Sequence, residues 1–180
     1  MTGRVVIVLP EPCLVVLIGA AGAGKSTFAA RHFLAGEVLS SDAFRERISG
    51  DPGDQRATRP AFAALHRALA RRLAAGLTTV VDATNATDHA RRALLGRSRA
   101  AGMPAVAIVL DLREAVVLAR NAGRGGRAVP DDAVLAHLAD VAATRDAGRL
   151  EGEGFSAVIR LADPASVDAV VVDRATWRAL

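Results

Sequence analysis

The chain has 180 residues, a formal net charge of +4 and 51% hydrophobic residues. This length suits one domain, expected to span residues 1–180, and the hydrophobic fraction excludes a disordered chain. No apolar run approaches the roughly 18 to 20 residues that cross a bilayer, and the first apolar stretch is too short for a secretory signal. We therefore expect no membrane association and a cytoplasmic location. The single cysteine, Cys13, lies in an apolar run and is predicted to be a packed thiol.

Apolar β-rich runs alternate with Ala-, Leu- and Arg-rich helical stretches, which is typical of an α/β fold with a central, mostly parallel sheet flanked by helices. Strands are predicted at 4–9, 13–18, 37–40, 77–81, 105–110, 155–161 and 169–172. Helices are predicted at 25–35, from 42 onward, and at 58–75, 87–101, 114–121 and 130–146. The segment 49–55, rich in Gly, Pro and Asp, is predicted to be a loop.

The segment 19–26, with the sequence GAAGAGKS, follows a predicted buried strand and opens a predicted helix. It fits the phosphate-binding pattern G-x-x-x-x-G-K-[ST], the P-loop. Its small residues let backbone N–H groups turn toward phosphate oxygens, Lys25 can reach the β- and γ-phosphates, and Ser26 offers a hydroxyl to Mg²⁺. Lys25 is also the only lysine beside 22 arginines. The sequence therefore predicts a P-loop NTPase or kinase fold that binds ATP or another NTP.

Two classes of P-loop protein are disfavoured by the motifs that they require. A Ras-like GTPase needs N-K-x-D, which a chain with its only lysine in the P-loop cannot supply, and L-S-G-G-Q of transport ATPases is absent. A small kinase with an arginine-bearing lid at about 120–130 fits better. Arg120, Arg124 and Arg127 are spaced to project to one side, and we expect them over the phosphates, although solvated surface arginines are the alternative.

Two acids end predicted strands, at the edge of a parallel sheet where ligands bind. Asp42 could take the proton of an acceptor hydroxyl or cap the helix that it begins. Arg45 lies three residues further on the same helix face and could hold an anion there. Asp82 could act on Mg²⁺, through water, or hold an arginine, and the alternative is a plain strand-end acid. The four histidines show no ligand spacing, so no zinc site is indicated.

Charge is distributed unevenly along the chain. Residues 61–130 carry 11 basic and 4 acidic residues, a sum of +7, whereas residues 131–180 carry 5 and 9, a sum of −4. A basic middle suits a polyanionic ligand, and solvated arginines on helix faces explain it equally well.

Five segments in order, GAAGAGKSTFAARHF, EVLSSDAFR, DPGDQ, TVVDATN and RNAGRGGRAVP, resemble the kinase domain of the bacterial polynucleotide kinase-phosphatases of RNA repair. The last also resembles the lid of phage polynucleotide 5′-kinases. The resemblance extends from about residue 13 to 172. It implies transfer of the γ-phosphate of an NTP to the 5′-hydroxyl of RNA or DNA, with Mg²⁺ or Mn²⁺. Members of the family often continue into phosphatase and ligase domains, so such partners are expected.

The resemblance also implies roles for individual residues. Donor-phosphate and metal contacts are expected from Gly22, Ala23, Gly24, Lys25, Ser26 and Thr27. Arg120 and Arg124 would clamp the donor phosphates. Asp42 would be the general base, with Arg45 on the acceptor's 3′-phosphate and Gln55 beside the acceptor. Asp82 would support Arg45 or the metal site.

Two other functions stay open. A small-molecule P-loop kinase, of the gluconate or antibiotic type, would share everything except the acceptor, and Arg45 discriminates because a neutral metabolite has no phosphate to pair with it. A non-catalytic nucleotide-binding module would have no need of Asp42.

Overall fold

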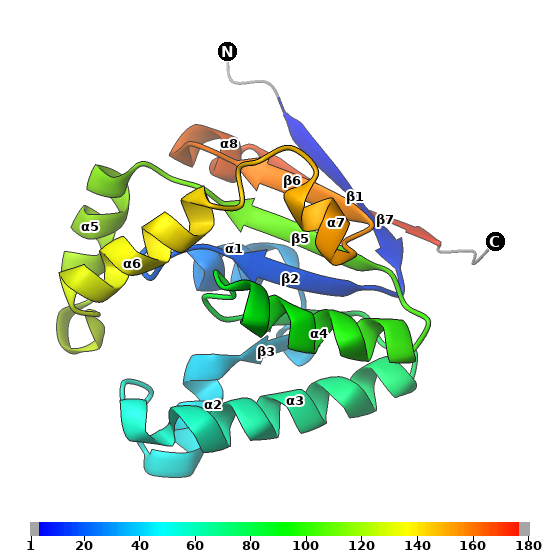
Figure 1. Cartoon of the computed structure of the whole chain (residues 1–180), viewed down its shortest axis with the longest axis horizontal. Coiled ribbons are helices and arrows are strands. Elements are labelled where there is room, and N and C mark those ends of the chain that lie inside the picture. Colours follow the sequence, from blue (N-terminus) through cyan, green and yellow to red (C-terminus); the bar gives the residue numbers. More distant parts are fainter. Residues whose placement is uncertain (1–3, 177–180) are drawn as a thin grey trace.

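The computed structural model describes residues 4–176, except for the side chain of Gln55. Five parallel strands form the main sheet in the order β3-β4-β2-β5-β6 (Figure 1). Their bounds are β2 Leu14–Ile18, β3 Val38–Ser40, β4 Thr79–Asp82, β5 Ala105–Leu110 and β6 Ala157–Leu161. The predicted α/β fold with a central parallel sheet is therefore confirmed. Within the described residues, no helix has the length and apolar character to cross a membrane.

The helices connect these strands and cover both faces of the sheet (Figure 1). Their bounds are α1 Lys25–His32, α2 Ser41–Ser49, α3 Thr58–Ala74, α4 Asp88–Ala100, α5 Glu114–Ala122, α6 Asp131–Ala142, α7 Arg149–Glu153 and α8 Pro164–Asp168. Helix α6 ends at Ala142, four residues before the predicted end at residue 146. Just beyond this end, the hydroxyl of Thr144 donates to the carbonyl of Val141 at 2.7 Å.

Alternating side chains of the central strand β2 serve two hydrophobic cores. Val15 and Leu17 pack in the core that contains Phe28 of α1, whereas Leu14 and Val16 pack in the core that contains α3 and α4 residues such as Leu65. All five residues of β2 are fully buried. This burial on both faces explains the continuous apolar run in the sequence.

Two further strands, β1 Val5–Glu11 and β7 Val170–Thr176, pair in parallel as a separate two-stranded sheet. Their inner side chains join the core on the α1 side. Cys13, between β1 and β2, is fully buried, and burial raises the pKa of its thiol to about 12. The thiol is therefore packed and protonated at neutral pH, as the sequence predicts.

Candidate active site

The P-loop leaves the carboxyl end of β2 and leads into α1, as predicted. Gly22 and Gly24 have φ values of +86° and +96°, a left-handed conformation that favours glycine. A Cβ on Gly22 would lie 2.5 Å from the carbonyl oxygen of Val117 in α5. The loop therefore packs directly against α5, and only glycine fits at this position. Ala23, within the loop, is fully buried, and its N–H donates to the carbonyl of Ala20 at 3.1 Å.

Lys25 begins α1 and is held inside the loop. Its Nζ donates to the carbonyl oxygens of Gly19 and Ala20, at 2.8 and 2.9 Å. Burial lowers the pKa of Lys25 to about 8, and Asp82 opposes this shift by favouring the charged form. The ammonium thus lies in the position from which it can turn toward a bound phosphate.

Asp82 ends β4 beside the P-loop and is 5% exposed. Burial raises its pKa, and a hydrogen bond with Ser26 and the charge of Lys25 oppose the rise. Asp82 thus lies with Ser26 and Lys25 rather than with Arg45, the other partner that the sequence suggested. Its carboxylate and the Ser26 hydroxyl are oxygen ligands of the kind that Mg²⁺ prefers when substrate phosphates supply others. The residues present therefore fit a magnesium ion.

Asp42 lies in the first turn of α2, next to the end of β3. The side chain of Ser40 accepts from the N–H of Ala43 at 3.5 Å and is the N-cap of this helix. Asp42 is therefore not the cap, and its carboxylate is available for other contacts. It pairs with Arg45, and Ser41 Oγ donates to the same oxygen at 3.3 Å.

Arg45 is held from two sides. Its Nε donates to the carbonyl oxygen of Pro52 at 2.7 Å, and its Nη2 contacts Asp42. The side chain is 13% exposed. A cation is therefore fixed beside the Asp42 carboxylate, on the helix face that the two residues share.

The 120–130 segment comprises the end of α5 and the residues after it, and it brings three arginines to the site. Arg120, Arg124 and Arg127 all line the same pocket as the P-loop. A Cβ on Gly24 would lie 3.4 Å from Nη1 of Arg120, and Arg124 Nη2 lies 3.7 Å from Oδ2 of Asp42. The three arginines therefore line one pocket with the P-loop, and their place over bound phosphates stays a prediction.

Asn121, between two of these arginines, fixes the fold of the segment. The side chain is 1% exposed, its Nδ2 donates to the carbonyl of Val129 at 2.7 Å, and its Oδ1 accepts from the N–H of Val129 at 3.0 Å. This pair of hydrogen bonds closes the segment 121–129 into a loop that presents Arg124 and Arg127 to the pocket. The sequence analysis missed this role of Asn121, although an Asn beside Gly-rich turns is a residue type that bonds to nearby backbone.

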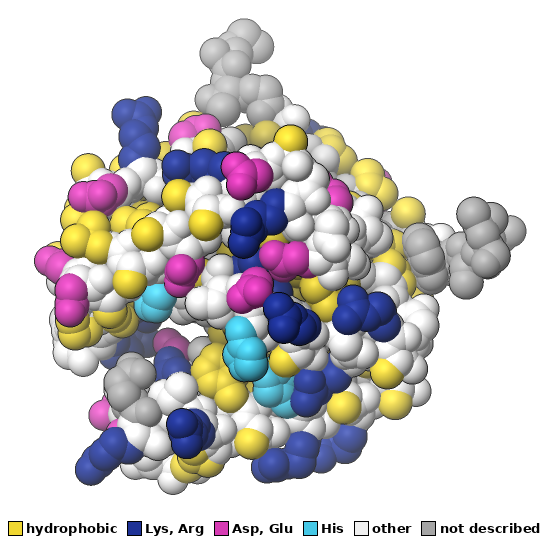
Figure 2. Space-filling view, viewed as in Figure 1, with side chains coloured by type: hydrophobic (Ala, Val, Ile, Leu, Met, Phe, Trp, Pro, Cys, Tyr) yellow, Lys and Arg dark blue, Asp and Glu magenta, His cyan; other side chains and the backbone are white. Residues whose placement is uncertain are grey.

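One pocket of about 820 Å³ contains most of these residues. Figure 2 shows a hollow between the part formed by α5 and α6 and the part formed by α2 and α3, with basic and acidic side chains inside it. The pocket is lined by Gly22, Gly24, Lys25, Ser26, Thr27, Asp42, Arg45, Asp82, Arg120, Arg124 and Arg127, among others. The structure thus brings together every predicted site residue except Ala23, which is buried within the loop, and Gln55, whose side chain is outside the described part.

The pocket also has walls formed by residues to which the sequence analysis assigned no individual role. Pro52 and Gly53 line it near Arg45, and Val167 and Asp168 of α8 line it beyond the P-loop. Asp168 accepts from Arg31 of α1 at 2.9 Å. Residues 137 positions apart meet here, a relationship that no local pattern reveals.

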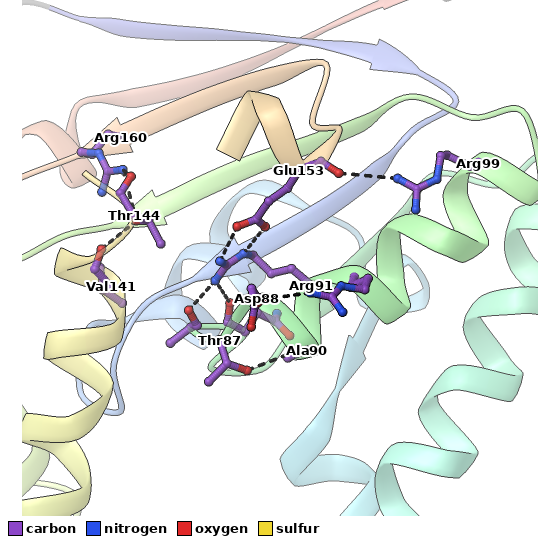
Figure 3. A network of polar contacts seen from close by, with 12 residues as sticks. Thr87, Asp88, Ala90, Arg91, Arg99, Val141, Thr144, Glu153 and Arg160 are labelled. Carbon is purple, nitrogen blue, oxygen red and sulfur yellow. Dashed lines mark hydrogen bonds and ion pairs between the residues drawn. The ribbon is translucent and has the colours of Figure 1, made fainter. Parts of the chain in front are cut away.

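A buried arginine supports the loop that follows Asp82. Arg91 of α4 is 1% exposed, and it makes two hydrogen bonds of 2.7 Å to Glu153 of α7 (Figure 3). It also donates to the carbonyls of Asn85 and Ala86. Asn85 in turn has φ +47° and donates to the carbonyl of Leu17 at 2.8 Å, next to the P-loop. This chain of contacts fixes the loop after β4 relative to β2.

Comparison with known proteins shows the family. A family model described as an AAA domain matches residues 14–147, well over half of the chain. The chain belongs to this family. No curated protein matches it.

Solved structures with the same fold include several kinases. One is from the Pnkp1/Rnl/Hen1 RNA repair complex, with 23% identity and a TM-score of 0.61; the match covers 77% of this chain and 46% of that one. A gluconokinase from Sinorhizobium meliloti 1021 is 20% identical with a TM-score of 0.54, covering 89% and 90%. A sugar kinase from Janibacter sp. HTCC2649 is 23% identical with a TM-score of 0.57, covering 84% and 86%. At these identities the likeness shows the fold that this AAA domain shares with P-loop kinases.

Proposed function

We propose that the protein is a polynucleotide 5′-hydroxyl kinase, which transfers the γ-phosphate of ATP or another NTP to the 5′-OH end of RNA or DNA. The observation that carries the proposal is the pairing of Asp42 and Arg45 opposite the P-loop in one pocket. A carboxylate for the acceptor hydroxyl and a fixed cation beside it suit an acceptor that carries its own phosphate. The sequence resemblance to the polynucleotide kinases supports the same acceptor.

The residues divide into a donor side and an acceptor side. On the donor side, Lys25, Arg120 and Arg124 neutralise charge on the phosphates, and backbone N–H groups of the P-loop hold them. Ser26 and Asp82 would hold Mg²⁺ or Mn²⁺, which supplies further charge stabilisation when bound. Thr27, next in the chain and lining the pocket, would add to these phosphate contacts.

On the acceptor side, Asp42 orients the 5′-hydroxyl and takes its proton. The hydroxyl oxygen forms a bond to the γ-phosphorus, the bond from that phosphorus to the β,γ-bridging oxygen breaks, and the nucleoside diphosphate leaves. Arg45 pairs with the phosphate 3′ to the first nucleoside. Gln55 would contact the acceptor as well. The product is a 5′-phosphorylated end, which suits nucleic-acid end repair beside phosphatase and ligase domains or subunits in the cytoplasm.

The test uses γ-labelled ATP, Mg²⁺ and a 5′-hydroxyl oligonucleotide, with gluconate and an aminoglycoside as competing acceptor classes. We expect label in the oligonucleotide, loss of transfer in Asp42→Ala, and a larger effect of Arg45→Ala on acceptor KM than on donor KM. Label in a small molecule alone would overturn the proposal in favour of a metabolite or antibiotic kinase. Nucleotide binding with no transfer to any acceptor would favour a binding module.

A further inference from the structure

Helix α3 presents an unpaired basic face. Its 17 residues include four arginines and no acidic residue. Arg59, Arg67 and Arg71 are exposed and make no ion pair within the described part of the chain. These three residues are called the arginine stripe here. Two of them, Arg67 and Arg71, belong to the basic middle of the sequence, and none of the three is among the residues that line the active-site pocket.

The stripe lies on one line of the helix surface. Positions 59, 63, 67 and 71 are four residues apart and share a face, away from the buried residues Leu65 and Leu69. With a rise of 1.5 Å per residue, the stripe is about 18 Å long and its last two arginines are about 6 Å apart. The intervening position, Ala63, has a small side chain that leaves the surface open. A flexible, extended anion can therefore contact all three guanidinium groups at once.

The stripe begins near the acceptor side of the pocket. Pro52 and Gly53 line the pocket beside Arg45, and α3 starts only five residues after Gly53. Helix α2, which carries Asp42 and Arg45, packs against α3. Arg59, the first arginine of the stripe, is thus six residues along the chain from Gly53 in the pocket wall, on a helix that packs against the one carrying Arg45.

Acidic side chains on this face gather on the other side of the hollow from α3, although basic side chains are also present above it (Figure 2). Figure 2 shows basic side chains along α3 at the bottom of the view and acidic side chains gathered above, around α6. Helix α6 carries Asp131, Asp132 and Asp140. A polyanion leaving the pocket is therefore attracted toward α3 and repelled from α6.

We propose that the arginine stripe binds the phosphodiester backbone of the acceptor strand downstream of its 5′ end. The proposal rests on the proposed kinase function and narrows its substrate to strands of several nucleotides. A small metabolite held in the pocket has no phosphates that reach the stripe. Three guanidinium groups along about 18 Å suit contacts with backbone phosphates, which carry no sequence information.

The test compares acceptors of different length. Steady-state kinetics with a 5′-OH nucleoside 3′-monophosphate and with 5′-OH oligonucleotides of two to ten nucleotides measure acceptor KM in the intact protein and in the variant Arg59→Gln, Arg67→Gln, Arg71→Gln. The control variant Arg4→Gln, Arg113→Gln, Arg149→Gln removes three exposed arginines outside α3, so both variants lower the formal net charge from +4 to +1. Fluorescence anisotropy with a labelled decanucleotide measures binding independently of catalysis.

We expect acceptor KM of the intact protein to fall with length, and the α3 variant to lose this dependence with about a tenfold rise in KM for the decanucleotide. Its activity on the nucleoside 3′-monophosphate stays within twofold, which also shows that the variant is folded. In the α3 variant, the plot of log binding constant against log salt concentration becomes less steep by about 2, because three phosphate contacts on a single strand are lost. The control variant keeps the length dependence.

Other outcomes overturn the proposal in distinguishable ways. Equal KM at every length, or a length dependence that the α3 variant retains, rejects the stripe but leaves the kinase function standing. Failure to phosphorylate any of these acceptors rejects the kinase function and the stripe with it. Stripe-dependent binding to vesicles of anionic lipid, with decanucleotide binding unchanged in the α3 variant, assigns the surface to a membrane instead.

Discussion

Arg124 Nη2 lies 3.7 Å from Oδ2 of Asp42, the carboxylate whose other oxygen is held by Arg45. A residue placed on the donor side of the reaction thus contacts the residue placed as the base. In the proposed reaction, donor phosphates would attract Arg124, so that Asp42 would lose one of its two cations and keep Arg45. The proposal therefore implies that binding of the donor and availability of the base are coupled through this contact.

The first prediction concerns Asp42. Replacing it in Asp42→Asn removes the proton acceptor but keeps the shape, so we expect kcat to fall by about 10² to 10⁴-fold. Donor binding should change only a few-fold, because Lys25, Arg120 and the P-loop backbone are intact. Transfer assays and titration with a non-hydrolysable NTP measure the two effects. Asp173→Asn, at an exposed position of β7, is the control, and an equal loss there would contradict the assignment.

A second prediction follows from the lowered pKa of Lys25. Burial lowers this pKa to about 8, so the ammonium of the free protein loses its proton as the pH rises from 7 to 9. A neutral amine attracts phosphate less, and we expect the Kd for ATP to rise by about tenfold over this interval. Isothermal titration calorimetry at several pH values measures it. In Lys25→Arg the guanidinium stays charged, so the dependence of the Kd for ATP on pH should vanish. A Kd that does not change with pH in the intact protein would count against a buried ammonium that loses its proton in this range.

Two glycine substitutions should have opposite effects on stability. Gly22→Ala places a methyl group 2.5 Å from the carbonyl oxygen of Val117 at φ +86°, so we expect a loss of at least about 1 kcal/mol in the free energy of unfolding. Gly96→Ala in α4 meets no atom within 4 Å and should stabilise by about 0.5 to 1 kcal/mol through helix propensity. Urea denaturation measures both. Equal effects of the two substitutions would show that the P-loop does not pack on α5 as described.

The fourth prediction concerns the buried contact between Arg91 and Glu153. Glu153→Ala leaves a buried guanidinium without its carboxylate, and we expect a loss of about 3 kcal/mol in the free energy of unfolding. Glu151→Ala, at an exposed position of the same short helix, should change it by less than about 0.5 kcal/mol. Urea denaturation again distinguishes the two. A small effect of Glu153→Ala would mean that solvent or another group replaces the carboxylate.

Local patterns in the sequence predict much of the main sheet and the P-loop. The run at 105–110 matches β5 residue for residue, because a strand buried on both faces leaves a continuous apolar signal. Helix α8 was missed although its signal is present. Asp163 caps it, Ser166 completes the capping box and Pro164 takes the first turn. Helix α7, with only five residues between Gly148 and Gly154, is too short for a periodic pattern to show.

The candidate site was predictable where residues follow a strand or share a helix face. Asp42, Arg45 and Asp82 are examples, because parallel strands deliver their carboxyl ends to one edge of the sheet. The wall that Asp168 forms and the support that Arg91 gives were not predictable. Both depend on contacts between elements more than 60 residues apart, which the sequence of either element does not encode alone.

The pairing of β1 with β7 bears on how the chain folds. Val5 lies opposite Val170, so the first and last described strands meet across a separation of 165 residues. A parallel pair cannot form as a local hairpin, and the entropy of closing so long a loop must be lost before any contact between the strands compensates for it. These two strands should therefore join only after the five-stranded sheet has brought them together, and substitutions in them should speed unfolding more than they slow folding.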